Sequence, residues 1–176
     1  PPHKDFRTTN YAFPRELGCT LSHLKGIIHG SRYNENILML EDDIFINDNA
    51  SNILEESMNE LPEDWGLLYL SGRPKDQTYH FSKNLIKTNT FLSTISYLIN
   101  KNYVYSYIDH VLNNLTNPFP NSCADNVLNG FFINNSYCIY PKIVNPMSGY
   151  SVLRFGNRDY ENDWDLDWKQ FSPKKT

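Results

Sequence analysis

The stretch Asn36-Ile37-Leu38-Met39-Leu40-Glu41-Asp42-Asp43-Ile44 decides the fold, because four apolar residues run directly into three acids. A short apolar run bounded by polar residues is typical of a buried strand. Carboxylates at the carboxyl end of such a strand lie where open α/β sheets bind their ligands. We therefore predict a buried strand over residues 36–41 that ends in three acids.

The three acids have two interpretations when this stretch is taken alone. Adjacent carboxylates repel one another, and a divalent cation relieves the repulsion, because Mg²⁺ and Mn²⁺ prefer hard oxygen ligands. Side chains alternate along a strand, so Glu41 and Asp43 are expected to point the same way. The other interpretation is a strand that ends in a solvated acidic turn, and the stretch alone leaves both open.

Length, charge and cysteine content exclude several classes of protein. The chain has 176 residues, which predicts one domain with a core of its own. Its formal net charge of -4 gives no electrostatic argument for nucleic-acid binding. No apolar run approaches the roughly 18 residues of a membrane span, and the start does not resemble a secretory signal, so a cytoplasmic protein is expected. The widely spaced Cys19, Cys123 and Cys138 are expected to be free thiols.

Helical and strand patterns alternate along the rest of the chain. Residues 1–18 are predicted to be an extended lead-in. Helices are expected over residues 20–29 (capped by Thr20), 52–61 (capped by Ser51), 102–115 and 124–132. Further strands are expected over residues 65–70, 85–87, 91–99 and 137–144. The alternation predicts an α/β fold with a mostly parallel central sheet flanked by helices, over residues 1–156, and an irregular tail over 157–176.

Three polar residues outside the acidic stretch have both a structural and a functional interpretation. His23 lies on the helix before the strand, where a structural histidine is commoner than a catalytic one, and Ser22 reads as an ordinary helix residue. Asp125 begins the helix over residues 124–132, where a carboxylate interacts favourably with the helix dipole. If Asp125 faces the acidic pair, it becomes a candidate general base for an acceptor hydroxyl.

The order of the motifs resembles glycosyltransferase family 25, which includes lipooligosaccharide and collagen hydroxylysine galactosyltransferases. Members show a Gly-Cys-x-x-Ser-His motif followed by an apolar strand and Glu-Asp-Asp. Here these are Gly18-Cys19-Thr20-Leu21-Ser22-His23 and, after residues 24–36, Ile37-Leu38-Met39-Leu40-Glu41-Asp42-Asp43. Weaker landmarks follow in the family's order, and the resemblance runs from about Gly18 to Leu153.

The resemblance implies a GT-A-like fold and inverting transfer from a UDP-hexose, UDP-galactose or UDP-glucose. The acceptor would be a hydroxyl on a glycan or a hydroxylysine, and the cofactor would be Mn²⁺ or Mg²⁺. It implies Asp125 as the catalytic residue and Glu41 and Asp43 as the metal ligands. The donor-binding residues that it implies are Ser22, His23, Glu41, Asp42 and Asp43.

Two departures from the family pattern leave other functions open. The strand–helix segment that usually begins a member is not found, so a shortened member is expected. Ser151-Val152 stands where members often carry Ser-Asp, and Ala124 replaces the usual apolar neighbour of the later Asp. A catalytically inactive binding or scaffolding module of the same fold is the main alternative. A metal-dependent phosphoryl-transfer enzyme ranks last, because the chain has no Gly-rich phosphate loop.

Overall fold

The structure, a computed structural model, describes residues 14–75, 78–87, 90–117, 123–147, 149–151 and 156–158. The helices are α1 (Pro14–Gly30), α2 (Ala50–Glu60), α3 (Val104–Leu115) and α4 (Ala124–Phe132), with 3-10 turns η2 (Ser31–Tyr33) and η3 (Lys101–Tyr103). The first six strands are β1 (Ile37–Leu40), β2 (Ile44–Ile46), β3 (Leu67–Tyr69), β4 (Arg73–Pro74), β5 (Tyr79–His80) and β6 (Leu85–Lys87). The others are β7 (Phe91–Leu92), β8 (Ser96–Ile99), β9 (Ser136–Ile139), β10 (Val144–Pro146), β11 (Gly149–Ser151) and β12 (Gly156–Arg158).

The central sheet is mixed and mostly antiparallel, so the prediction of a mostly parallel sheet is wrong. Its six described strands lie in the order β1-β8-β3-β9-β6-β5, and within it β3 and β9 form the parallel pair. Strands β1, β3 and β9 do run in one direction, as the alternation of helices and strands predicted. The difference arises because β8 inserts antiparallel between β1 and β3, and β6 returns antiparallel beside β9. The connections from β3 to β8 and from β6 to β9 join antiparallel strands, so neither needs the right-handed crossover that a parallel pair requires.

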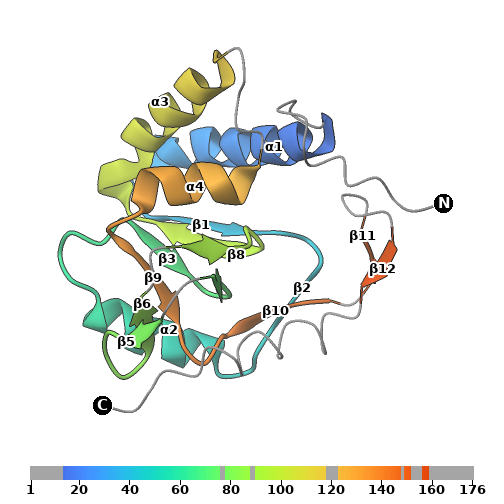
Figure 1. Cartoon of the computed structure of the whole chain (residues 1–176). Coiled ribbons are helices and arrows are strands. Elements are labelled where there is room, and N and C mark those ends of the chain that lie inside the picture. The colour runs from blue at the N-terminus through green and yellow to red at the C-terminus, as the bar shows by residue number, and fades with distance from the viewer. Residues whose placement is uncertain are drawn as a thin grey trace.

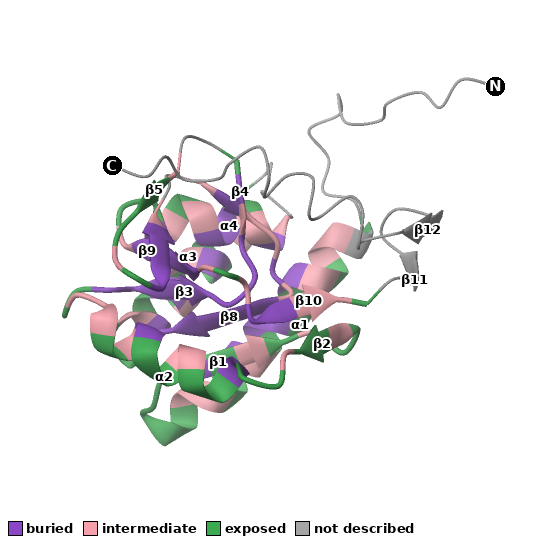
Figure 2. Ribbon diagram, turned by 90° about the horizontal axis from the view of Figure 1, so that it is seen from below, coloured by how far each residue is buried: buried purple, intermediate pink, exposed green. Residues whose placement is uncertain are grey.

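Helices cover both faces of the sheet (Figure 1). Helices α1, α3 and α4 lie on one face, and the core there includes Leu24, Ile27, Val111 and Leu128 packed on Tyr97. Helix α2 lies on the opposite face, where a second core joins Ala50 and its partly buried neighbours to the strands. The central strands β3, β8 and β9 are buried between these layers (Figure 2). The expected α/β layering is therefore confirmed, although the sheet is not parallel.

Helix α1 begins earlier than predicted and packs closely on β1. It starts at Pro14, a residue that fits the first helical turn because its missing N–H would have no partner there. Thr20 is buried inside the helix rather than capping it, so that prediction is wrong, as is an extended lead-in over residues 14–18. The rest of that lead-in, residues 1–13, lies outside the described residues. A Cβ at Gly26 would meet the Met39 Cε atom at 2.9 Å, so this glycine allows the close approach.

Strand β1 is an edge strand, not the fully buried strand that its sequence predicts. In the described sheet it pairs with β8 alone. Ile37 is buried against α1, whereas Leu38 and Leu40 are 44% and 41% exposed. An apolar run therefore marks a strand correctly here but overstates its burial, because one face has no covering layer among the described residues.

Boundaries elsewhere differ from the predictions where turns interrupt a pattern. Helix α2 begins at Ala50 with Asn49 as its N-cap, so Ser51 is not the cap. The expected strand over 91–99 divides into β7 and β8 at Ser93, whose φ is 92°. The expected strand over 137–144 divides into β9 and β10 around the cis peptide Tyr140-Pro141. Helix α4 and strand β6 have the predicted bounds.

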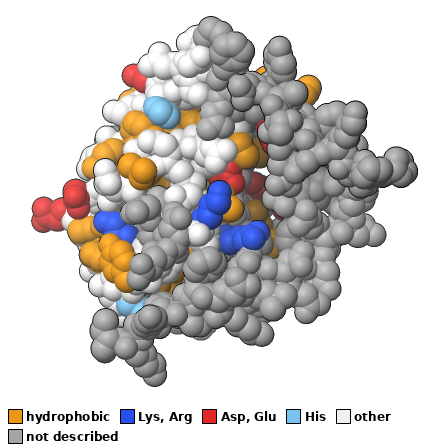
Figure 3. Space-filling model, in the orientation of Figure 1, with side chains coloured by type: hydrophobic (Ala, Val, Ile, Leu, Met, Phe, Trp, Pro, Cys, Tyr) orange, Lys and Arg blue, Asp and Glu red, His pale blue; other side chains and the backbone are white. Residues whose placement is uncertain are grey.

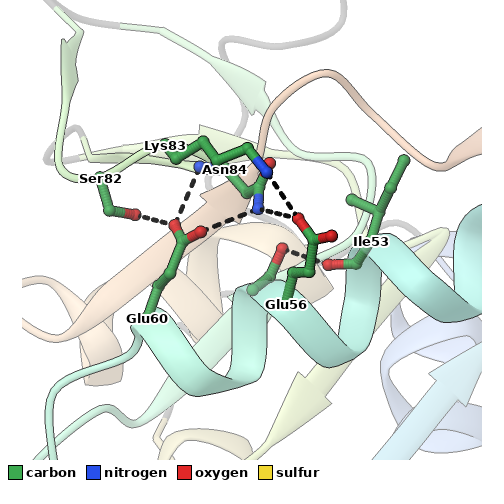
Figure 4. A network of polar contacts seen from close by, with 7 residues as sticks. Ile53, Glu56, Glu60, Ser82, Lys83 and Asn84 are labelled. Atoms are coloured by element: carbon green, nitrogen blue, oxygen red, sulfur yellow. Dashed lines mark hydrogen bonds and ion pairs between the residues drawn. The ribbon is translucent and has the colours of Figure 1, made fainter.

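A polar network ties α2 to the turn between β5 and β6 (Figure 4). Glu60 accepts hydrogen bonds from the backbone N–H of Asn84 at 2.9 Å, from its side-chain amide at 2.8 Å, and from the Ser82 hydroxyl. Glu56 accepts from the same amide at 3.1 Å and pairs with the exposed Lys83 at 2.8 Å. These contacts fix the helix on the face opposite α1 and leave the acidic end of β1 free.

On the face shown in Figure 3, described Lys and Arg side chains lie in small groups among hydrophobic and uncharged surface. Among the described residues, no helix is both long enough and apolar enough to cross a membrane.

Candidate active site

The acidic end of β1 lies at the end of the sheet where β1, β3 and β9 all have their carboxyl ends. Because β1, β3 and β9 run the same way, their carboxyl ends meet there, together with the start of β8. Leu40 pairs with Ser96, and one step further the Glu41 N–H donates to the Ile95 carbonyl at 2.9 Å. This register sets Glu41 beside the segment that leads into β8, in the position where open sheets bind ligands.

Glu41 is held by two side chains from different elements. The Thr94 hydroxyl donates to its Oε1 at 3.0 Å, and His23 Nε2 on α1 lies 3.5 Å from the same oxygen. Burial would raise the pKa of Glu41. The hydrogen bond and charge of His23, with the Thr94 hydrogen bond, outweigh that effect and lower the pKa. Glu41 is therefore a fixed anion at the end of β1.

His23 is a buried cation in this arrangement. Its Nδ1 lies 2.7 Å from the Tyr97 hydroxyl, and Tyr97 is on β8 opposite Met39. Burial would lower its pKa, but hydrogen bonds to Cys19 and Glu41 and the charges of both raise the pKa to about 9. Both ring nitrogens of the imidazolium then act as donors, Nδ1 to Tyr97 and Nε2 toward Glu41. The histidine thus links α1, β8 and the acidic stretch.

Cys19 joins His23 and Glu41 in a group that can hold a metal ion. One ligand atom from each of the three residues lies within 4.8 Å of the others. All three cysteines are free thiols, as predicted. The role of Cys19 in this group was missed from the sequence. The available signal was its spacing of four residues from His23, which places both on one helix face.

Asp42 and Asp43 lie in the exposed bend after β1. Burial raises the pKa of Asp43, and the neighbouring charges of Glu41 and Asp42 raise it further. No ion pair among the described residues involves either aspartate. The strand ends at Leu40, so strand alternation does not explain how Glu41 and Asp43 are oriented. Asp43 is therefore a carboxylate with two negative neighbours and no ion-pair partner among the described residues.

Asp125 lies in the first turn of α4 and near the same half of α1. Its Oδ1 accepts from the Cys123 thiol at 2.8 Å and from the Asn126 N–H at 2.9 Å. Burial raises the pKa of Cys123 to about 12, with further contributions from Asp125, Glu16 and Cys19. Asp125 on α4 and Cys19 on α1 therefore both act electrostatically on the Cys123 thiol. Helices α1 and α4, which carry Cys19 and Asp125, pack beside one another on the same face of the sheet.

Ser22 lies outside this arrangement. Its side chain is exposed on α1 and makes no hydrogen bond with any described residue. The departure from the family pattern at Val152 lies outside the described residues. The structure thus brings together Cys19, His23, Glu41 and Thr94, and places Ser22 on the solvent side of the same helix.

The layers of helices on a mixed sheet define an α/β protein, and its acidic stretch lies at the carboxyl ends of three strands that run in one direction. The sequence model of glycosyltransferase family 25 (LPS biosynthesis protein) matches residues 13–152. The chain therefore belongs to glycosyltransferase family 25, and the resemblance read from its motifs is confirmed. Comparison with individually curated proteins gives no significant match.

Proposed function

We propose that this protein is an inverting, metal-assisted hexosyltransferase that transfers galactose or glucose from a UDP-hexose to an acceptor hydroxyl. Family membership supports a sugar donor and an acceptor. The family's association with LPS biosynthesis favours a glycan acceptor over hydroxylysine. The observation that carries the proposal is the acidic bend at the carboxyl end of β1, which forms no ion pair with any described residue, and beside which Glu41 is anchored.

The acidic bend fits the divalent cation that such a transfer uses. Asp43 and Glu41 would hold Mn²⁺ or Mg²⁺, since both offer hard oxygen ligands and the repulsion at Asp43 has no cationic partner among the described residues. When bound, the ion would supply charge neutralisation for the diphosphate that leaves. Asp42 is exposed next to them and is the further donor-side carboxylate.

Asp125 is the proposed general base. Its Oδ1 is occupied by Cys123 and Asn126, and this fixes the carboxylate at the start of α4. The carboxylate would take the proton of the acceptor hydroxyl as the new oxygen–C1 bond forms. The bond between C1 and the diphosphate oxygen breaks at the same time, and its electron pair leaves with UDP. His23 would position Glu41 rather than touch the sugar.

Release of UDP from UDP-galactose and UDP-glucose in the presence of Mn²⁺ tests the proposal. Asp43→Asn should abolish Mn²⁺-dependent donor binding in calorimetry, because it removes the charge that holds the ion. Asp48→Asn, at an exposed acid shortly after the same stretch, is the matched control and should leave binding intact. Asp125→Asn should retain donor binding and lose sugar transfer.

The proposal fails if wild-type protein binds no UDP-hexose with Mn²⁺ present. Donor binding without any turnover across a panel of saccharide acceptors would instead favour the inactive binding module. Equal losses of donor binding in the variants at positions 43 and 48 would show only a general effect of negative charge.

A further inference from the structure

We propose that Cys19, His23 and Glu41 form a second metal site, which is selective for Zn²⁺ and shares Glu41 with the acidic bend. The three ligands come from two elements that the fold presses together. Cys19 and His23 are one helical turn apart on α1, and Glu41 follows β1. Their ligand atoms already lie within 4.8 Å of one another.

The distances suit zinc after a small inward adjustment. Zinc bonds of about 2.0–2.3 Å in a tetrahedron put neighbouring ligand atoms roughly 3.3–3.8 Å apart. His23 Nε2 and Glu41 Oε1 are at 3.5 Å, which lies within that range. The Cys19 thiol is partly buried and lies within 4.8 Å of a ligand atom of each of these two residues. Three protein ligands leave the fourth position for water or another ligand.

The chemistry of the ligands separates this site from the acidic bend. Thiolate and imidazole are soft or intermediate ligands that select zinc, whereas carboxylate oxygens alone suit Mg²⁺ and Mn²⁺. Once His23 gives up its proton to bind the ion, a thiolate and a carboxylate bring two negative charges to this partly buried place, and a doubly charged ion neutralises them. Any proton held by the Cys19 thiol or by His23 Nε2 is released to solvent when the ion binds.

A second layer of contacts already orients the ligands. Metal-bound histidines usually donate their other ring N–H to a neighbouring acceptor, which fixes the ring. His23 Nδ1 lies 2.7 Å from the Tyr97 hydroxyl, so Nε2 is the nitrogen that faces Glu41. Thr94 donates to Glu41 Oε1 at 3.0 Å and holds that carboxylate in turn. Both supporting residues belong to β8 or the segment that leads into it, on the sheet.

Zinc at this site would join α1 to the end of β1. It would occupy Glu41 Oε1, whereas no hydrogen bond or ion pair with a described residue reaches Oε2. Zinc would therefore stabilise the fold and fix Glu41, while Asp43 stays available to the donor's cation. The site shares Glu41 with the one under the proposed function and differs from it in its other ligands and in its metal. It does not depend on that function, because Cys19 and His23 are not ligands of the donor's cation.

A cobalt titration of the chelator-stripped full chain tests the zinc site directly. Bound Co²⁺ should give a thiolate-to-cobalt charge-transfer band in the near ultraviolet and intense visible bands of a tetrahedral ion. One equivalent of Zn²⁺ should remove these bands and raise the melting temperature. Cys19→Ser should lose the charge-transfer band, and His23→Gln should weaken Co²⁺ binding by at least tenfold.

Two matched variants keep the result specific. Cys123→Ser removes a different thiol and should retain the spectrum, and Asp43→Asn should retain it although donor binding is lost. Circular dichroism establishes that each variant is folded. An unchanged charge-transfer band in Cys19→Ser overturns the proposal, as does a wild-type spectrum with only the weak bands of an octahedral ion. Loss of donor binding in Asp43→Asn with an intact cobalt spectrum separates the two sites.

Discussion

The ion pair between His23 and Glu41 predicts a specific pH dependence of stability for the metal-free protein. The pKa of His23 is raised from 6.5 to about 9 in the folded state. A group with a raised folded pKa stabilises the protein fully below its unfolded pKa and loses that effect as the pH rises through its folded pKa. Stability should therefore fall between about pH 6.5 and pH 9.

The size of the effect follows from the same two pKa values. Each pKa unit corresponds to about 1.4 kcal/mol, so the rise from 6.5 to about 9 corresponds to a contribution on the order of 3 kcal/mol. The side chain of His23 is 11% exposed, so solvent screens the interaction little. Glu41 acts in the opposite direction at low pH. Its lowered pKa means that its contribution is present above its ordinary pKa of 4.5 and is lost as the pH falls through its folded pKa.

Urea unfolding followed by circular dichroism between pH 6 and pH 9.5, in buffer with a chelator, measures this dependence. Wild-type protein should lose roughly 3 kcal/mol of unfolding free energy over that range in excess of the loss in His23→Gln. Glu41→Gln should reduce this excess loss of unfolding free energy, because it removes one of the partners that raise the pKa of His23 against the effect of burial. His29→Gln removes an exposed histidine from the same helix and should keep the wild-type slope. A wild-type slope equal to that of His23→Gln would refute the assignment of a buried imidazolium.

Three other substitutions test how the fold is held together, each measured by the free energy of unfolding in urea. Asn84→Ala removes the buried amide that donates to α2 and should cost about 1–3 kcal/mol, whereas Lys83→Ala at the exposed neighbour should change little. Gly66→Ala would set a Cβ 2.7 Å from Phe132 Cδ1 and should cost about 1–3 kcal/mol through overpacking, and an unchanged stability would show that this contact relaxes freely. Tyr69→Phe removes a buried hydroxyl that has no hydrogen-bond partner among the described residues and should leave stability equal or higher, so a loss above about 1 kcal/mol would contradict this interpretation.

The sequence predicted the helices and strands better than it predicted which of them are neighbours in the fold. Helix α4 and strand β6 have the expected bounds, because their patterns are bounded by a break on each side. The direction of the sheet could not be predicted, because the place of β8 depends on how a long segment after β3 returns. Burial of β1 was overestimated for a related reason. An apolar run reports the character of a strand and does not report whether a further layer covers it, as the exposed Leu38 shows.

The candidate site was predicted in its parts but not in its connections. The acidic stretch and His23 were both found, and family membership accounts for their order along the chain. Their contact was not predictable from spacing, since it depends on α1 lying across β1 at Gly26 and on the register that sets Thr94 beside Glu41. Cys19 was read as one free thiol among three because no pair of cysteines has metal-binding spacing. Helical spacing already sets it one turn from His23, and the fold then brings both to the Glu41 carboxylate.

The repulsion among the three adjacent acids is relieved in two different ways along the stretch. Glu41 is compensated within the protein by His23 and Thr94, so the fold tolerates this carboxylate without any metal. The bend at Asp42 and Asp43 has no such cationic partner among the described residues, and the raised pKa of Asp43 reflects that. The benefit that a divalent cation brings is therefore concentrated at Asp43 and is available to a diphosphate. Glu41 is neutralised within the protein, whereas no described cation compensates Asp43. The same short stretch can therefore hold α1 on the sheet and still present negative charge to a ligand.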